Sequence, residues 1–252
     1  MHSGIDTAVL LVGGEGTRLR PLTYEIAKPL IPVQGKPVME HLLDLFKVFG
    51  INSVILSVGY KKEQIKSRYG SYFNGLSISY VEEDQPLGTA GPLKLLEEQG
   101  RLPSKPFIVS NGDELKDIDI NEMSSLHMQN NALVTIALTK VQDPSVYGVA
   151  RLEGNKILEF VEKPAPGTEP SNFINSGFYI YTPEAVALAP KGRSMSELSV
   201  FPKVASMGRL YGYKFAGQWF DTGTFERWGQ AIKGWKGLTV GKGATGKELG
   251  KP

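Results

Sequence analysis

The chain has 252 residues, 41% of them hydrophobic, with 28 basic against 26 acidic residues and a net charge of +2, so we expect a folded globular protein with a sizeable core and no nucleic-acid-binding surface. The absence of cysteine excludes disulfides and thiolate metal sites, and three scattered histidines make a zinc site unexpected. No apolar run approaches a membrane span and the N-terminus carries no signal-peptide pattern, so the expectation is a soluble cytoplasmic protein that binds no membrane.

Strand and helix patterns alternate through the first half of the chain. Apolar β-rich runs predict strands, and amphipathic runs bounded by proline or glycine predict helices. The predicted strands and helices, in chain order, are a strand at 7–12, a helix at 37–49, a strand at 53–58, a helix at 62–69, a strand at 77–81, a helix including 92–98, a strand at 107–110, a helix at about 120–129 and a strand at 133–138. This alternation predicts a mainly parallel sheet with helices on both faces, where ligands bind beyond the carboxyl ends of the strands.

The second half is richer in predicted strands. Runs at 147–152 and 157–161 flank a glycine turn and predict a hairpin, and further strands are expected at 173–181 and 210–215. A helix near 196–206 contains a proline, so it should be short or kinked.

The end of the chain changes character after Gly237. A last helix is expected at 224–235, and its Trp228 and Trp235 either pack onto the domain, which we favour, or face another copy in a homo-oligomer. Residues 238–252 are rich in glycine, lysine and threonine, so we expect a flexible tail there.

The run Gly13–Thr23, GGEGTRLRPLT, is the most informative motif because it directly follows the first predicted strand. Its glycines let the backbone approach a ligand closely, and Arg18 and Arg20 add charge suited to a phosphate-rich ligand. Lys28 adds another cation shortly afterwards. The spacing matches neither the dinucleotide-binding fingerprint nor the P-loop, and a glycine-rich surface turn is the structural alternative.

Two aspartates have matching surroundings at the ends of apolar runs. Asp113 ends the motif Asn-Gly-Asp, and Asp221 lies in Trp-Phe-Asp-Thr-Gly. Magnesium often binds one or two carboxylates together with substrate phosphates, although each aspartate could equally cap a turn or helix. Asp117 and Asp119 have the spacing of a glycosyltransferase Asp-x-Asp motif, but we favour two exposed acids at a helix start.

Three further motifs are each weak when taken alone. Glu162-Lys163-Pro164 closes a strand and could contact a sugar hydroxyl and a phosphate, or be a surface pair before a turn. Leu87–Gly91, LGTAG, is a second glycine loop that opens a helix. Asn175-Ser176-Gly177 interrupts a strand, where glycine often marks a bulge or a close approach to a ligand.

In their order along residues 7–236, these motifs resemble the signature of the sugar-1-phosphate nucleotidyltransferases, or NDP-sugar pyrophosphorylases. The LGTAG loop and Leu56–Tyr60 are most similar to mannose-1-phosphate or heptose-1-phosphate guanylyltransferases. The resemblance implies a three-layer α/β/α Rossmann-like nucleotide-diphospho-sugar transferase fold with a mixed, mainly parallel central sheet and a small β-rich sugar-binding part. It implies one domain at 1–237, with a nucleotide-binding half at about 1–135 and a sugar-phosphate-binding half at about 136–237. The hexapeptide repeats of a left-handed β-helix are lacking, so no such domain is expected.

The resemblance also implies roles for individual residues. The expected catalytic residues are Arg18, Lys28, Asp113, Lys163 and Asp221. The expected nucleotide-binding residues are Leu11, Gly13, Gly14, Glu82, Gly88 and Thr89. The expected sugar-phosphate-binding residues are Gly112, Gly148, Glu162, Lys163 and Asn175. Asp113 and Asp221 are expected to bind Mg²⁺ as the cofactor.

The implied reaction joins a sugar 1-phosphate to a nucleoside triphosphate and releases pyrophosphate. Mannose 1-phosphate and GTP are the first expectation, because a carboxylate at Glu82 could accept both the N1–H and amino hydrogens of guanine. The alternatives are a uridylyl- or thymidylyltransferase for glucose 1-phosphate or an N-acetylated sugar 1-phosphate, a glycosyltransferase that consumes nucleotide sugars, and a non-catalytic regulatory homologue. The motifs do not identify the sugar, since pocket shape decides it.

Three positions depart from the family pattern. Ala27 stands where a proline usually precedes the Lys-Pro pair, which could loosen that turn. Ser176 replaces a usual alanine or threonine, and Thr222 replaces a usual isoleucine; both changes look tolerable.

Overall fold

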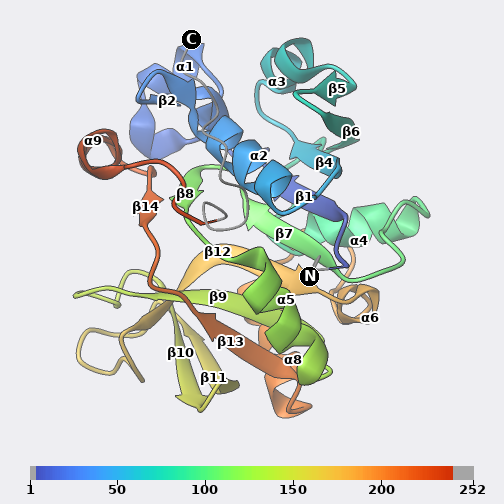
Figure 1. Cartoon of the computed structure of the whole chain (residues 1–252), viewed down its shortest axis with the longest axis vertical. Helices are drawn as coiled ribbons and strands as arrows, with labels where there is room; N and C mark the ends of the chain where they lie inside the picture. The colour runs from blue at the N-terminus through green and yellow to red at the C-terminus, as the bar shows by residue number, and fades with distance from the viewer. Residues whose placement is uncertain (1–3, 241–252) are drawn as a thin grey trace.

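The computed structural model describes residues 4–240, and their framework is a ten-stranded mixed sheet (Figure 1). The strand order is β10-β11-β13-β9-β12-β7-β1-β4-β6-β5. In chain order these strands are β1 (Thr7–Leu11), β4 (Ser53–Val58), β5 (Tyr72–Phe73), β6 (Leu76–Glu82), β7 (Phe107–Asn111), β9 (Val134–Lys140), β10 (Gly148–Glu153), β11 (Lys156–Glu162), β12 (Phe173–Tyr181) and β13 (Leu210–Lys214). Two short pairs lie outside this sheet, β2 (Pro32–Val33) with β3 (Lys36–Pro37) and β8 (Glu114–Lys116) with β14 (Trp219–Asp221).

Pairing within the sheet changes between its two halves. Strands β7, β1, β4 and β6 are parallel neighbours, so their carboxyl ends share one edge. Strand β12 runs antiparallel to both β7 and β9, whereas β9 is parallel to β13. The predicted hairpin is formed by β10 and β11. The predicted mixed sheet is confirmed, with most of its parallel pairing in the first half of the chain.

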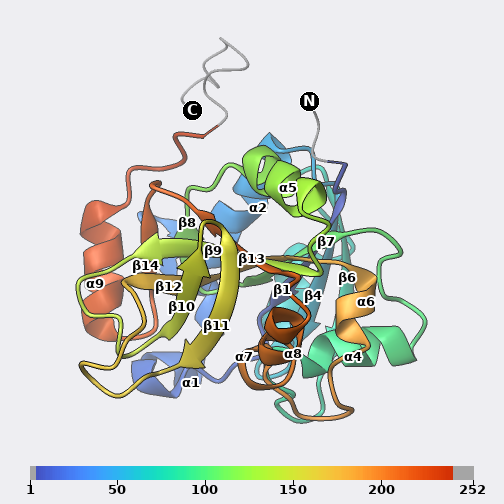
Figure 2. The same ribbon diagram turned by 90° about the horizontal axis from the view of Figure 1, so that it is seen from below.

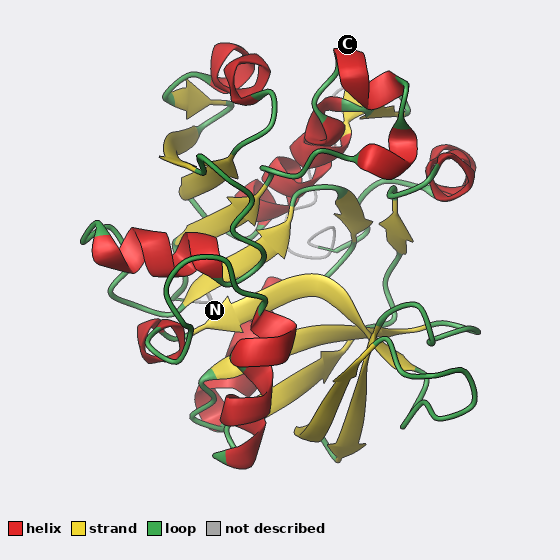
Figure 3. Cartoon of the chain, turned by 180° about the vertical axis from the view of Figure 1, so that it is seen from behind, coloured by secondary structure: helices red, strands yellow, loops and turns green. Residues whose placement is uncertain are grey.

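Helices cover both faces of the sheet, as Figures 2 and 3 show. One face carries α2 (Val38–Val48), α3 (Lys62–Tyr69) and α5 (Ile120–Gln129). The other carries α4 (Gly91–Glu98), α6 (Pro183–Val186), α7 (Ser196–Ser199) and α8 (Phe201–Ser206). Side chains of β1 alternate accordingly, with Ala8 and Leu10 in the first core cluster and Val9 in the second. The predicted three-layer α/β/α arrangement is confirmed.

Proline divides the helix that was predicted at 196–206. It consists of α7 and α8, which meet at Val200, and Pro202 lies in the first turn of α8. Proline is tolerated there because the first helical N–H groups have no intrahelical partner. The short helix α1 (Leu22–Glu25) and the 3₁₀ turns η1 (Thr17–Leu19) and η2 (Lys28–Leu30) were not predicted.

The last described elements return to the first half of the chain. Helix α9 (Phe225–Gly234) follows β14, and the indole N–H of Trp228 donates to the carbonyl of Pro32 at 2.9 Å. The indole of Trp235, just beyond α9, donates to Nδ1 of His41 at 3.2 Å. Both tryptophans therefore contribute to packing within the chain. No helix among residues 4–240 is long and apolar enough to cross a membrane.

Asp117 forms hydrogen bonds with residues that follow α9. Its carboxylate accepts the backbone N–H groups of Thr239 and Val240 at 3.0 and 3.1 Å. The prediction of an exposed acid is wrong for Asp117, which is 2% exposed. Asp119 lies at the start of a helix as predicted, and it also caps α5 by accepting the N–H of Glu122 at 3.0 Å. Of the tail predicted at 238–252, residues 238–240 are packed in this way, and 241–252 lie outside the described residues.

Candidate active site

The glycine-rich loop begins at the carboxyl end of β1 and borders a cavity of about 190 Å³. The predicted site residues that line this cavity are Leu11, Gly14, Arg18, Lys28 and Asp113. Gly16 has a φ of 64°, and a Cβ there would lie 2.9 Å from a methyl carbon of Thr23, so only glycine suits the turn. Gly112 packs the end of β7 against this loop, since its Cβ would lie 2.3 Å from Cγ1 of Val12.

Lys28 and Asp113 form an ion pair in the wall of this cavity. Burial lowers the pKa of Lys28, but the charge of Asp113 and its hydrogen bond outweigh burial and leave that pKa raised. Burial alone would raise the pKa of Asp113. The charge and hydrogen bond of Lys28 have the larger opposite effect, so the pKa of Asp113 is lowered. Both groups are therefore charged at neutral pH, and the cavity holds a fixed cation beside a fixed anion.

Asp221 reaches the same region from β14. It stands opposite Glu114 in the β14–β8 pair, and the Thr222 hydroxyl donates to the carbonyl of Asp113 at 2.7 Å. The guanidinium of Arg227 donates to Oδ2 of Asp221 at 2.5 Å. Gly223 lines the cavity with Arg18, and its Cβ would lie 3.0 Å from the Arg18 guanidinium. The structure thus brings both predicted metal ligands close to the glycine loop.

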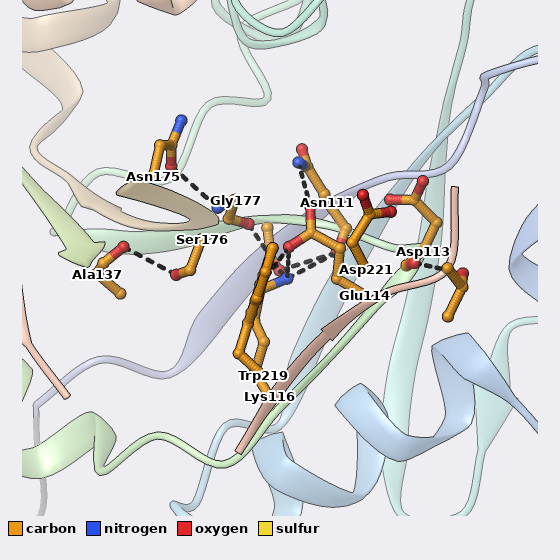
Figure 4. Close-up of polar contacts among 12 residues, drawn as sticks. Asn111, Asp113, Glu114, Lys116, Ala137, Asn175, Ser176, Gly177, Trp219 and Asp221 are labelled. Carbon is orange, nitrogen blue, oxygen red and sulfur yellow. Dashed lines mark hydrogen bonds and ion pairs between the residues drawn. The ribbon is translucent and has the colours of Figure 1, made fainter. Parts of the chain in front are cut away.

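A buried ion pair, Lys116 with Glu114, supports these carboxylates (Figure 4). The Lys116 side chain is 0% exposed, and its Nζ lies 3.4 Å from Oε2 of Glu114. Glu114 also accepts the indole N–H of Trp219 at 2.8 Å and the amide of Asn111 at 2.9 Å. Burial raises the pKa of Glu114, and the nearby charges of Asp113 and Asp221 add to this while Lys116 opposes it. Three carboxylates therefore crowd together here.

A second cavity, of about 340 Å³, lies on the other side of the glycine loop. It is lined by Gly13, Tyr60, Glu83 and Gln85 among others. The carboxylate of Glu83 accepts the Ser57 hydroxyl at 2.5 Å and the backbone N–H of Leu87 at 2.9 Å.

Glu82 does not line this second cavity, although the sequence suggested it for the base pocket. It ends β6 and points toward α3, where Lys62 and Lys66 donate to its two oxygens at 2.7 and 2.9 Å. These lysines lower the pKa of Glu82 to about 2. Adjacent side chains of an extended segment point in opposite directions, so Glu83 faces the cavity instead.

The second glycine loop packs against the segment that leads into α7. Gly88 has a φ of 80°, and a Cβ there would lie 2.4 Å from the carbonyl oxygen of Ser194. The Thr89 hydroxyl donates to Oε2 of Glu197 at 2.5 Å and accepts the N–H of Ser196 at 2.8 Å. Gly88 and Thr89 therefore lie outside the lining of the two cavities.

The predicted sugar-side residues Gly148, Glu162 and Asn175 lie on β10, β11 and β12, and Lys163 directly follows β11; none of them lines the first cavity. Gly148 pairs with Glu162 across the hairpin, and a Cβ on it would lie 2.7 Å from a carboxylate oxygen of Glu162. Lys163 has a left-handed φ of 48° and a side chain that is 68% exposed. Asn175 stands at the predicted bulge of β12, where its Oδ1 accepts the N–H of Gly177 at 2.9 Å.

Two aromatic side chains join the two groups of residues. The rings of Trp219 and Tyr147 meet edge-to-face with centroids 5.6 Å apart. The carbonyl of Tyr147 accepts the N–H of Lys163 at 3.0 Å, and the guanidinium of Arg227 lies over its ring, 5.2 Å from the centroid. This contact places the Asp221 side of the site next to the Gly148 and Lys163 side.

Several residues of this region were not singled out from the sequence, namely Glu83, Glu114, Lys116, Glu197 and Arg227. Arg227 left one signal, since a cation in the first turn of a helix is disfavoured by the helix dipole and suggests another partner. Glu197 is buried beside Thr89 and Tyr179, and burial raises its pKa. No comparable sequence signal points to the other four residues.

A family model described as "Nucleotidyl transferase" matches residues 7–235. A mannose-1-phosphate guanyltransferase of Yarrowia lipolytica is 40% identical over 85% of this chain and 60% of its own length. A mannose-1-phosphate guanylyltransferase of Mycobacterium tuberculosis is 39% identical over 87% of this chain and 61% of its own. The chain thus spans about three fifths of the length of these curated relatives.

Solved structures resemble about nine tenths of the chain. A Bacillus anthracis protein described as a glucose-1-phosphate thymidylyltransferase superimposes with a TM-score of 0.80 and 27% identity, over 90% of this chain and 94% of that one. The protein HddC of Yersinia pseudotuberculosis, solved in complex with GMP-PN, superimposes with a TM-score of 0.74 and 26% identity, over 91% and 99% of the two chains.

Proposed function

Because this chain belongs to the nucleotidyl transferase family, we propose that it joins a sugar 1-phosphate to a nucleoside triphosphate, giving an NDP-sugar and pyrophosphate. One observation carries the proposal, namely the cavity that combines a glycine loop, Arg18, Lys28 and Asp113. Its backbone N–H groups and cations suit a triphosphate. The sugar phosphate would approach from the side of Gly148 and Lys163, as residues 136–237 are proposed to hold it.

Mannose 1-phosphate and GTP are the proposed substrates. Relatives named mannose-1-phosphate guanylyltransferases are 37–40% identical to this chain, and this supports that pair. A glucose-1-phosphate thymidylyltransferase with the same fold keeps a thymidylyl- or uridylyltransferase as the alternative. The glycosyltransferase alternative loses its metal motif, since Asp117 is occupied by backbone N–H groups and Asp119 by a helix cap.

The base is proposed to enter the second cavity, next to Gly13. We infer that Glu83 takes the role first assigned to Glu82, because it lines this cavity while Glu82 is held by two lysines. A carboxylate that already accepts two hydrogen bonds retains further lone pairs for N–H donors of a base.

The donor set of the first cavity fits a magnesium ion. Residues 4–240 contain no cluster of three or more protein ligands suited to a metal, so a cation here would depend on Asp113, Asp221 and substrate oxygens. Magnesium usually binds in this way, through one or two carboxylates and phosphates. When bound, it would be held by Asp113 and Asp221 and would supply positive charge that offsets the charge of the substrate phosphates.

The residues of the chain supply positioning and charge. An oxygen of the sugar phosphate attacks the α-phosphorus, a new P–O bond forms, and the bond to pyrophosphate breaks. The attacking oxygen is already anionic at neutral pH, so no general base is needed. Arg18 and Lys28 neutralise charge on the leaving pyrophosphate, and Lys163 offsets repulsion between the two anionic substrates.

A pyrophosphate-release panel tests the proposal. Each of the four nucleoside triphosphates is combined with mannose, glucose, heptose and N-acetylglucosamine 1-phosphates, with Mg²⁺ or with EDTA. GTP with mannose 1-phosphate and Mg²⁺ is expected to be fastest, and Asp113→Asn is expected to abolish most of the release. Asp44→Asn is the matched control, since Asp44 pairs with Lys36 on the surface. Absence of release from every combination would refute the proposed reaction.

A further inference from the structure

Arg227 occupies an unusual place for a cation. It lies in the first turn of α9, where its backbone N–H donates to the hydroxyl of the capping residue Thr224 at 3.3 Å. The helix dipole opposes positive charge at this end of a helix. Helix stability therefore does not account for the residue, and its contacts in the site must be considered.

The guanidinium of Arg227 contacts both sides of the proposed active site. On one side it donates to Oδ2 of Asp221, and on the other it lies over the ring of Tyr147. Tyr147 precedes Gly148, and its carbonyl accepts the N–H of Lys163. The residue thus stands where the carboxylate of β14 meets the loop that carries the proposed sugar-phosphate ligands.

The charges around Arg227 define what could bind beside it. Burial raises the pKa of the Tyr147 hydroxyl, and the charges that act on it come from Arg227, Asp221, Glu114 and Arg18. Two of these groups are guanidinium ions and two are carboxylates, so a phosphate bound beside Arg227 would compete with Asp221 for its guanidinium. Part of the Arg227 side chain, 28%, is exposed and can be reached by a small molecule.

We propose that Arg227 binds the phosphate group of the sugar 1-phosphate, and that Asp221 holds its guanidinium in place until a divalent cation takes the carboxylate. This inference rests on the proposed function. A guanidinium carries five N–H donors in a fixed fork, more than one carboxylate oxygen requires, and the fork matches two phosphate oxygens. Binding of both ligands thus breaks the Asp221–Arg227 pair: the carboxylate of Asp221 then contacts the cation, and the guanidinium of Arg227 contacts the phosphate.

The proposal predicts opposite effects of one substitution on two ligands. Removing the guanidinium in Arg227→Gln should weaken binding of mannose 1-phosphate by roughly 10- to 100-fold, the value of a charge-assisted hydrogen bond. The same change should strengthen binding of Mn²⁺ alone several-fold, because Asp221 loses the cation that competes for it. Arg227→Lys keeps the positive charge but loses the forked set of N–H donors, so its affinities for mannose 1-phosphate and for Mn²⁺ should lie between those of the wild type and of Arg227→Gln.

The experiment uses calorimetric titration of the full chain with mannose 1-phosphate and with GTP, and Mn²⁺ titration followed by electron paramagnetic resonance. Lys233→Gln is the matched control, because Lys233 is exposed on the same helix. GTP affinity should be unchanged in all variants. If Arg227→Gln binds mannose 1-phosphate as tightly as the wild type, the inference is overturned. If the glutamine variant does not fold, wild-type affinity of Arg227→Lys for mannose 1-phosphate overturns it instead.

The outcomes separate this inference from the proposed function. If the wild type releases pyrophosphate and Arg227→Gln binds the sugar phosphate normally, only the role of Arg227 is wrong. If the wild type neither binds a sugar 1-phosphate nor releases pyrophosphate, the proposed function is wrong and the inference falls with it.

Discussion

The buried pair of Lys116 and Glu114 allows a quantitative prediction about stability. Lys116→Met keeps a similar length and removes the charge. Glu114 would then remain almost fully buried, with the indole of Trp219 and the amide of Asn111 as its donors. No ammonium would remain at 3.4 Å to balance its charge. The variant should therefore keep the packing of this region and lose its electrostatic balance.

The expected magnitude follows from the burial of both partners. Their side chains are 0% and 11% exposed, so solvent screens the pair weakly. Breaking a buried ion pair by removing one partner costs about 3–5 kcal/mol, whereas replacing both partners is often close to neutral. Lys116→Met should thus cost about 3–5 kcal/mol of unfolding free energy. The double variant with Glu114→Gln should be no less stable than the single one, despite its second change.

Urea denaturation followed by tryptophan fluorescence measures these differences, with an unchanged m-value as the check for two-state unfolding. Lys47→Met serves as the control, because Lys47 is an exposed lysine bonded to Asn74, and it should shift the unfolding free energy by less than about 0.5 kcal/mol. A cost below about 1 kcal/mol for Lys116→Met would refute the reasoning. Strict additivity of the two substitutions would refute it as well, since coupling is its central claim.

Three other predictions concern separate parts of the molecule. Asp113→Asn should lower turnover in the pyrophosphate-release assay by roughly 10²–10³ while the protein stays folded at assay temperature, and near-normal turnover would contradict its metal role. Burial lowers the pKa of His127 to about 4, so the folded state binds fewer protons than the unfolded state between pH 4 and 6.5. Unfolding free energy should rise across that window by about 3 kcal/mol; urea titrations at several pH values measure this, and His127→Gln should flatten the profile. Gly88→Ala should lower stability by about 1–3 kcal/mol, because its Cβ meets the Ser194 carbonyl at a positive φ; an unchanged unfolding midpoint would contradict this.

Local sequence patterns predicted many of the helices and strands. Helices α3 and α5 and strands β4 and β12 begin and end at the predicted residues. Asp119 caps α5, Gly70 ends α3, and β4 is a short apolar run. The glycine loop was predicted as a phosphate site and does line a cavity with Lys28 and Asp113. These features depend on neighbouring residues, and such information is present in a short window of sequence.

Other parts of the site depend on long-range pairing. Strands β8 and β14 are short and distant in sequence, so their pairing, which places Asp221 opposite Glu114, was not visible. The choice between Glu82 and Glu83 depends on which way side chains point at the end of β6. The burial of Asp117 arises only because the chain returns to it at Thr239. Each of these requires a tertiary contact that no local pattern encodes.

Strand β12 has a mechanical consequence for turnover. It pairs with β7 on one edge and β9 on the other, so continuous hydrogen bonding joins the proposed nucleotide side of the sheet to the proposed sugar side. The two sides cannot swing apart like the lobes of a hinged enzyme without breaking those hydrogen bonds. Entry of the proposed substrates and escape of the proposed NDP-sugar would then rely on the loops that rim the cavities. The rate of product release should accordingly respond to changes in these loops more than to changes in the sheet.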